Sequence, residues 1–154
     1  MNRLELIREK MNAIVDNMPD AGERAAACAH LYGVSMACVL LAQRRGENSE
    51  LAAVAGMLHD IATYKTGDSA AHAHRGAAMA EELLRETKLF SEEEIILIRY
   101  AIYSHSDKLN EHAPFAEVLI DADVLQHCLY DPSAPVAEHE QARFTKLQKE
   151  LYLK

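Results

Sequence analysis

The sequence predicts an all-α fold, a bundle of about six to seven helices. Stretches rich in alanine, leucine and glutamate dominate the chain, and the short alternating runs of β-branched residues that indicate strands are missing. The 4 prolines and the glycines Gly46 and Gly67 fall between segments whose apolar residues recur at helical spacing. Because the 154 residues contain neither repeats nor low-complexity stretches, we expect a single domain covering residues 1–154.

Cap and turn residues place the first three helices. The first helix ends before Pro19, and Asp20 can serve as the N-cap of a long second helix, which Gly46 closes. Asn48 or Ser49 begins the third helix, which is almost entirely apolar. Because the second helix carries few charges, we expect it to lie in the centre of the bundle.

Similar signals place the remaining four helices. Ser69 can cap the fourth helix, and Ser91 with Glu94 has the spacing of a capping box at the start of the fifth. Pro114 suits the first turn of the sixth helix, and two further prolines separate it from an amphipathic last helix. In chain order, the predicted helices span residues 4–18, 21–45, 50–63, 70–87, 92–105, 115–129 and 136–153.

Charge and composition exclude several classes of protein. The 24 acidic and 16 basic residues give a net charge of −8, whereas nucleic acids and anionic lipids favour a basic partner. No apolar run approaches the roughly 20 residues of a membrane-spanning helix, and the N-terminal residues lack a signal-peptide core. We therefore expect a cytoplasmic protein that binds neither nucleic acid nor a membrane. The negative net charge is still compatible with a small phosphorylated ligand, since such a ligand needs only a local pocket that is positively charged or holds a metal ion.

Several ionisable side chains lie in otherwise apolar parts of the predicted helices. These are His30 in the second helix, His59 and Asp60 in the third, His105 in the fifth, and Asp121 and Asp123 in the sixth. A buried carboxylate without a partner costs several kcal/mol, so Asp60 and Asp123 need a cation or several hydrogen-bond donors. Imidazoles together with carboxylates form a ligand set for a divalent transition metal.

The adjacent pair His59 and Asp60 leaves two arrangements open. Neighbouring side chains on a helix lie about 100° apart and do not face each other. The two residues could converge on one ion between helices, or Asp60 could bridge two ions while His59 holds one. The other ligands would come from other helices, where the best placed residues are His30, His105 and Asp123.

Each of these residues, taken alone, also has a structural interpretation. A single histidine on an apolar stripe is more often a hydrogen-bonded core residue than a ligand, and Asp121 or Asp123 could be one partner of an ion pair. His112, His127 and His139 lie in loops or on mixed faces, so we interpret them as structural. The joint occurrence of several ionisable groups in separate apolar helices is what favours a metal site.

The candidate His and Asp residues lie in five segments, which occur along the chain in the order RAAACAHLYGVSMACVLLA, LAAVAGMLHDIATY, HAHRGAAMAEELL, AIYSHSDK and VLIDADVL. Together they resemble the HD-domain superfamily of metal-dependent phosphohydrolases, of the small single-domain bacterial type. The resemblance covers about residues 25–125, and the helices predicted at 4–18 and 136–153 flank it. It implies a helical HD-domain bundle with metal ligands His30, His59, Asp60, His72, His105 and Asp123.

The resemblance also implies a chemistry. One or two divalent transition metal ions (Fe, Mn, Co, Ni or Zn) would polarise a phosphoryl oxygen and lower the pKa of a bound water, which the catalytic Asp60 would orient. The substrate would be a nucleotide or another small phosphorylated metabolite, cleaved at a phosphate ester or anhydride. Lys65, Arg75 and Lys108 are candidate substrate-binding residues, although a solvated surface cation describes each of them equally well.

Three alternatives use the same residues. A di-iron oxygenase of the HD fold would need the same ligands, a non-catalytic metal- or nucleotide-binding module would bind without turnover, and a plain helical bundle would bind no metal. The last alternative leaves Asp60 and Asp123 without an explanation. The two terminal helices either cover the core or form a dimer contact, so we expect a monomer or a homodimer.

Overall fold

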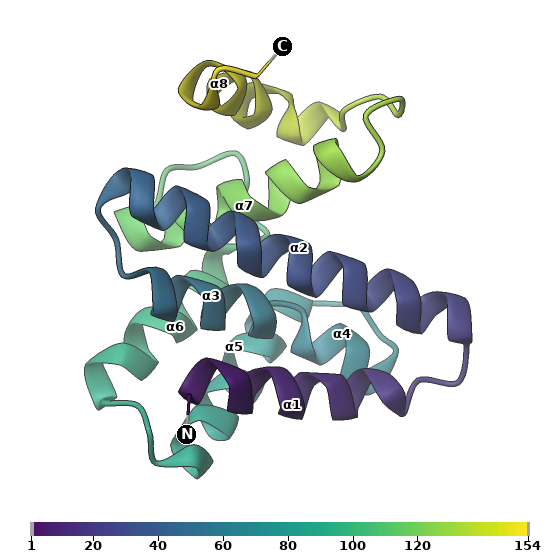
Figure 1. The fold of residues 1–154 in the computed structure, drawn as a ribbon, viewed down its shortest axis with the longest axis vertical. Coiled ribbons are helices and arrows are strands. Elements are labelled where there is room, and N and C mark those ends of the chain that lie inside the picture. The colour runs from purple at the N-terminus through teal and green to yellow at the C-terminus, as the bar shows by residue number, and fades with distance from the viewer. Residues whose placement is uncertain (1, 154) are drawn as a thin grey trace.

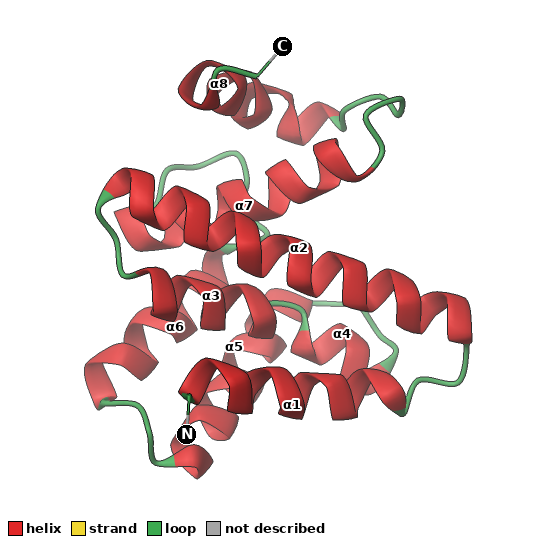
Figure 2. Cartoon of the chain, in the orientation of Figure 1, coloured by secondary structure: helices red, strands yellow, loops and turns green. Residues whose placement is uncertain are grey.

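The computed structural model describes residues 2–153, which form eight α-helices and one 3₁₀-helix and contain no strand (Figure 2). The all-α prediction is therefore confirmed. In chain order the helices are α1 (Arg3–Asp16), α2 (Ala21–Arg45), α3 (Ser49–Leu58), α4 (Ile61–Thr66), α5 (His72–Thr87), α6 (Glu92–Ser104), α7 (Pro114–Tyr130), the 3₁₀-helix η1 (Glu138–Glu140) and α8 (Gln141–Leu151).

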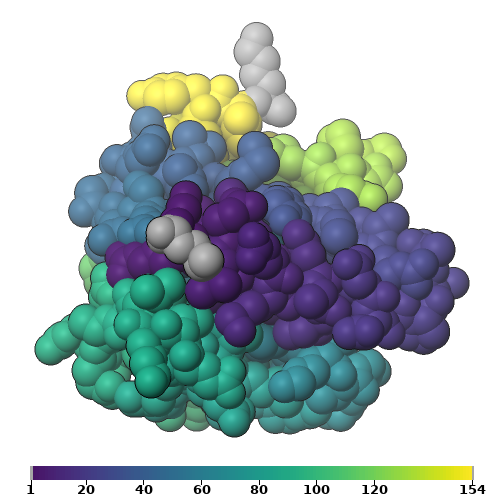
Figure 3. Space-filling model, turned by 60° about the horizontal axis from the view of Figure 1, so that its bottom comes forward, coloured from purple at the N-terminus to yellow at the C-terminus, as the bar shows by residue number. Residues whose placement is uncertain are grey.

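Helix α2 runs through the middle of the bundle, with α3 on one side and α7 on another (Figure 1). Its residues Leu31, Val34, Cys38 and Leu41 are fully buried against these two helices. Helices α5 and α6 pack against each other, α8 lies on α7, and α1 covers a further face (Figure 3). The core thus surrounds the middle of α2, where the first of the predicted ligands, His30, is found.

Helix α2 differs from one expectation. Among the helices of residues 2–153, it alone is long and apolar enough to cross a bilayer by length and composition, with a mean hydropathy of 1.8 in its most apolar stretch. The expectation that no segment has this character therefore needs correction. Packing explains the composition, since a helix that contacts neighbours on two sides is apolar on both.

The predicted third helix, 50–63, is instead two helices, α3 and α4. The chain leaves helical geometry at Asp60, whose φ and ψ are −105° and 17°. The ring of His59 donates a hydrogen bond from Nδ1 to the carbonyl oxygen of Gly56 at 2.7 Å, which holds the side chain against the end of α3. This break lets the neighbouring side chains of His59 and Asp60 turn toward the same space. The last predicted helix is likewise divided into η1 and α8.

A close approach of α2 and α3 brings their histidines together. A Cβ atom on Gly56 would lie 2.8 Å from the Cα atom of Ser35, so only glycine fits at this crossing. Ser35 also donates a hydrogen bond from Oγ to the carbonyl oxygen of Ala53 at 3.0 Å. Because the backbones are this close, His59 at the end of α3 reaches His30 on α2.

Candidate metal centre

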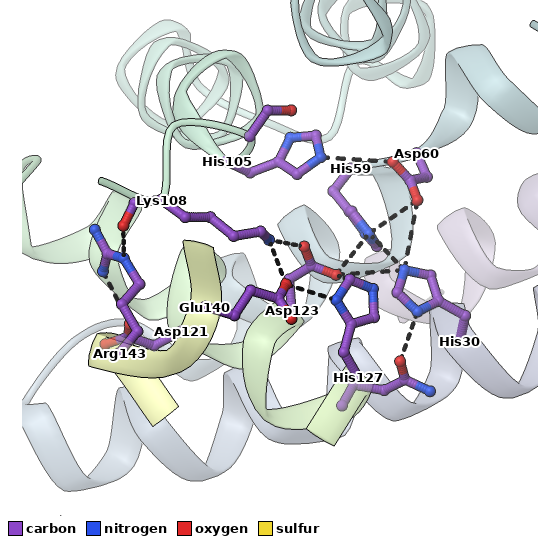
Figure 4. A network of polar contacts seen from close by, with 12 residues as sticks. His30, His59, Asp60, His105, Lys108, Asp121, Asp123, His127, Glu140 and Arg143 are labelled. Carbon is purple, nitrogen blue, oxygen red and sulfur yellow. Dashed lines mark hydrogen bonds and ion pairs between the residues drawn. The ribbon is translucent and has the colours of Figure 1, made fainter. Parts of the chain in front are cut away.

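Asp60 lies between two pairs of histidines that come from four different helical segments, and Figure 4 shows it beside His30, His59 and His105. Its Oδ2 atom is 3.4 Å from Nε2 of His30 and 3.3 Å from Nε2 of His59. Its Oδ1 atom is 3.6 Å from Nε2 of His72 and 3.5 Å from Nε2 of His105. Each oxygen of the carboxylate therefore faces one histidine pair, which is the arrangement expected of a residue that bridges two ions.

Asp123 of α7 joins the first of these pairs. Its Oδ1 atom is 3.5 Å from Nε2 of His30 and 3.8 Å from Nε2 of His59, while its Oδ2 atom accepts a hydrogen bond from Lys108. Asp123 is almost completely buried. Four residues therefore surround the first possible ion position, namely His30, His59, Asp60 and Asp123. The second is surrounded by Asp60, His72 and His105.

The separations between the carboxylate oxygens and the histidine nitrogens fit a bound cation better than direct hydrogen bonds. Two buried oxygens, Oδ1 of Asp60 and Oδ1 of Asp123, have no hydrogen-bond partner among the described residues. Their distances to the facing nitrogens exceed those of ordinary N–H···O bonds, which are about 2.7–3.2 Å. Ligands on bonds of about 2.1 Å lie roughly 3.0–3.4 Å apart around an ion, close to the spacing found between these side chains. The residues present therefore fit divalent ions.

The histidines are oriented in the same way. In each ring Nδ1 donates a hydrogen bond to an oxygen, so the neutral ring presents the lone pair of Nε2 to the carboxylates. Histidines that bind a metal through one ring nitrogen usually donate a hydrogen bond from the other in this way. The acceptors are Gln126 Oε1 for His30 at 2.7 Å, Gly56 O for His59 at 2.7 Å, Ser69 O for His72 at 3.1 Å and Ile102 O for His105 at 2.7 Å.

Electrostatics point to a cation at the first pair. Burial favours the neutral ring of His59, but the charges of Asp60 and Asp123 outweigh it and raise the pKa of His59 to about 9. Burial would likewise raise the pKa of Asp60, yet the surrounding histidines hold that pKa far below its usual range. By contrast, burial lowers the pKa of His105 and keeps this ring neutral. A proton on His59 therefore supplies the positive charge that the carboxylates need when no ion is bound.

We expect metal binding to expel this proton. A pKa of about 9 means that His59 is protonated at pH 7, whereas a ligand nitrogen must be neutral. Affinity for the ion should therefore rise by about tenfold per pH unit below pH 9 and level off above it. Calorimetric titrations at pH 7 in buffers of different ionisation enthalpy should report about one proton released for the ion that His59 binds. Release of no proton, or an affinity independent of pH, would contradict this protonation state.

The three predicted phosphate-binding cations lie in different surroundings. Lys108 is nearly buried, and its ammonium group contacts Asp123 and lies 3.5 Å from Glu140 Oε1, beside the centre. Arg75 instead pairs with Asp68 at 2.8 Å. Lys65 is exposed and lines a separate hollow between α1, α4 and α5. The structure therefore brings Lys108 to the histidines and carboxylates and leaves the other two away from them.

A cavity of about 270 Å³ opens onto the centre. Its walls include side chains that sequence reasoning had interpreted as structural or had not considered, namely His127, His139 and Glu140. His127 follows Asp123 by four residues and so lies on the same face of α7, a signal that the sequence did contain. The cavity is lined by Asp60, His72, His105, Ser106, Lys108, Asp123, His127, His139 and Glu140.

Comparison with known protein families bears on this arrangement. A family model described as HD domain matches residues 28–127, a range that contains all six predicted ligands. The chain belongs to the HD domain family. HD domains belong to a superfamily of metal-dependent phosphohydrolases and bind divalent metals. The groups of His and Asp side chains in this chain are compatible with such binding. Among curated proteins and among solved structures, the comparisons found no match.

Proposed function

We propose that this HD domain protein is a metal-dependent phosphohydrolase that cleaves a phosphate ester or anhydride of a nucleotide or another small phosphorylated metabolite. The observation that carries the proposal is the position of Asp60, which lines the cavity and whose two oxygens face two separate histidine pairs. Paired divalent ions at such a site would supply Lewis-acid activation of a water and of a phosphoryl oxygen.

The chain's own residues define what the cavity does with a substrate. Ser106 lines the cavity with its Oγ 3.2 Å from Nε2 of His72, and once an ion occupies this nitrogen the hydroxyl would be free to donate to a phosphate oxygen. Lys108 balances the charge of Asp123 and is the one of the three predicted cations that lines this cavity. Asp60, between the two histidine pairs, is placed to accept a hydrogen bond from the attacking water.

The size of the cavity favours cleavage near a phosphate end. At about 270 Å³ it lies just below the roughly 300–1,000 Å³ typical of sites that enclose a drug-sized ligand. It can hold a phosphoryl group and part of its neighbour, while the rest of a nucleotide would extend outside. We therefore expect little selectivity for the base and a stronger dependence on the number of phosphates.

The test combines metal removal with a substrate panel. Protein purified without chelator should release phosphate or a nucleotide from at least one of nucleoside mono-, di- and triphosphates or dinucleoside polyphosphates. Chelation should abolish this activity, and Fe²⁺, Mn²⁺, Co²⁺, Ni²⁺ or Zn²⁺ should restore it. Two bound ions with no hydrolysis would overturn the proposal. In that case an O₂-dependent product with a mixed-valent iron signal would identify an oxygenase, and tight nucleotide binding without turnover would identify a binding module.

A further inference from the structure

His127 meets the same conditions as the predicted histidine ligands, although it is not one of them. Its Nδ1 atom donates a hydrogen bond to Oε1 of Glu140 at 2.8 Å, so the neutral ring presents Nε2 as a lone pair. That Nε2 lies 3.3 Å from Oδ1 of Asp123, closer than Nε2 of His30 at 3.5 Å or Nε2 of His59 at 3.8 Å to the same oxygen. The ring also stacks on His30, with centroids 5.2 Å apart and planes 15° apart.

The two carboxylates beside His127 are held in place by other contacts. Lys108 binds Oδ2 of Asp123 and thereby leaves Oδ1, the buried oxygen without a hydrogen-bond partner among residues 2–153, facing His127. Glu140 is itself buried and belongs to η1, which lies beyond the residues matched by the HD domain model. The orienting carboxylate therefore comes from the C-terminal segment, as Figure 4 shows.

We propose that His127 is a further metal ligand, which binds through Nε2 the same ion as Oδ1 of Asp123, with Glu140 as the residue that orients its ring. This inference rests on the metal centre of the proposed function. It extends that centre by one imidazole and makes the C-terminal segment part of it. A carboxylate that accepts from a ligand histidine fixes the ring and makes the opposite nitrogen a stronger ligand.

Three variants separate this role from a structural one. In His127→Gln the amide can still donate to Glu140, so the hydrogen bond is kept while the imidazole is lost. Glu140→Gln keeps the imidazole but weakens its orientation. His112→Gln is the matched control, because His112 also pairs with a carboxylate, Asp107 at 3.1 Å, away from the cavity lining.

The measurements are calorimetric titration with Co²⁺ and the absorption spectrum of the Co²⁺ protein, which reports the number and geometry of ligands. Glu140→Gln should weaken binding by about 10- to 100-fold. His127→Gln should weaken it at least as strongly and change the spectrum, whereas His112→Gln should match the wild type. A folded His127→Gln protein with wild-type affinity and spectrum would overturn the inference.

A second measurement uses the wild-type protein and so does not depend on the folding of a variant. On addition of Zn²⁺, the ¹⁵N resonance of Nε2 in His127 should move to the range of a metal-bound nitrogen. An unchanged resonance in protein that has bound Zn²⁺ would show that His127 is not a ligand. A wild-type protein that binds neither Co²⁺ nor Zn²⁺ would instead overturn the proposed function itself, and the two failures are therefore distinguishable.

Discussion

Asp60→Asn is expected to remove both metal ions and to lower the rate of phosphate release by roughly 10³-fold or more. Asp60 is the one residue that faces both histidine pairs, through Oδ2 on one side and Oδ1 on the other. Asparagine replaces one of these oxygens with an NH₂ group, which presents hydrogens to the facing ligands and cannot bind a cation. The substitution also removes the negative charge that the two ion positions share, so it should affect both of them, whereas loss of any one histidine should affect one.

Metal content of protein purified without chelator, measured beside phosphate release, tests this expectation. Asp131→Asn is a suitable control, because Asp131 is exposed in the loop after α7 and its side chain accepts hydrogen bonds from the neighbouring Ser133. The control should retain the metal content and rate of the wild type. If Asp60→Asn protein is folded and still holds about two ions, the bridging position assigned to Asp60 is wrong.

Local signals in the sequence predicted most of the helices. Asp20 caps α2 by accepting from the backbone of Glu23, and Ser91 and Glu94 form the capping box that their spacing indicates. The division of the third helix was not predicted, because residues 51–58 are apolar and no proline between 50 and 63 marks a break. Helix α3 ends where the side chains of His59 and Asp60 turn toward one site. This is an effect of tertiary structure, which the helix propensities of the local residues do not predict.

The candidate site shows the same limit. The order of the motifs predicted six site residues, and the structure places these six close together. The motifs could be found in the sequence because each lies within its own helical segment. Glu140 carries no such signal, because it reaches His127 only after the chain turns back through the loop that follows α7. The sequence does not distinguish Lys65 from Lys108 as a substrate-binding residue. Only the packing of the helices determines that Lys108, and not Lys65, lines the cavity.

Arg143→Met is expected to destabilise the protein by about 3–5 kcal/mol, because it removes one side of a buried ionic network. The guanidinium group of this nearly buried α8 residue donates to Asp121 Oδ1 at 2.9 Å and to Glu117 Oε2 at 2.7 Å on α7. It also donates to the carbonyl oxygens of Lys108 at 2.7 Å and Asn110 at 2.6 Å in the loop after α6. Without it, two carboxylates and two carbonyls lose a partner in places that water reaches poorly.

Chemical denaturation of the metal-free protein measures this loss without a contribution from bound ions. Lys149→Met provides the comparison on the same helix, since Lys149 is exposed and its substitution should change the free energy of unfolding by no more than about 0.5 kcal/mol. Equal stability of the two variants would contradict the role given to Arg143. Because Arg143 holds the backbone of Lys108, and Lys108 in turn binds Asp123, folded Arg143→Met protein should also bind metal more weakly than the Lys149→Met protein.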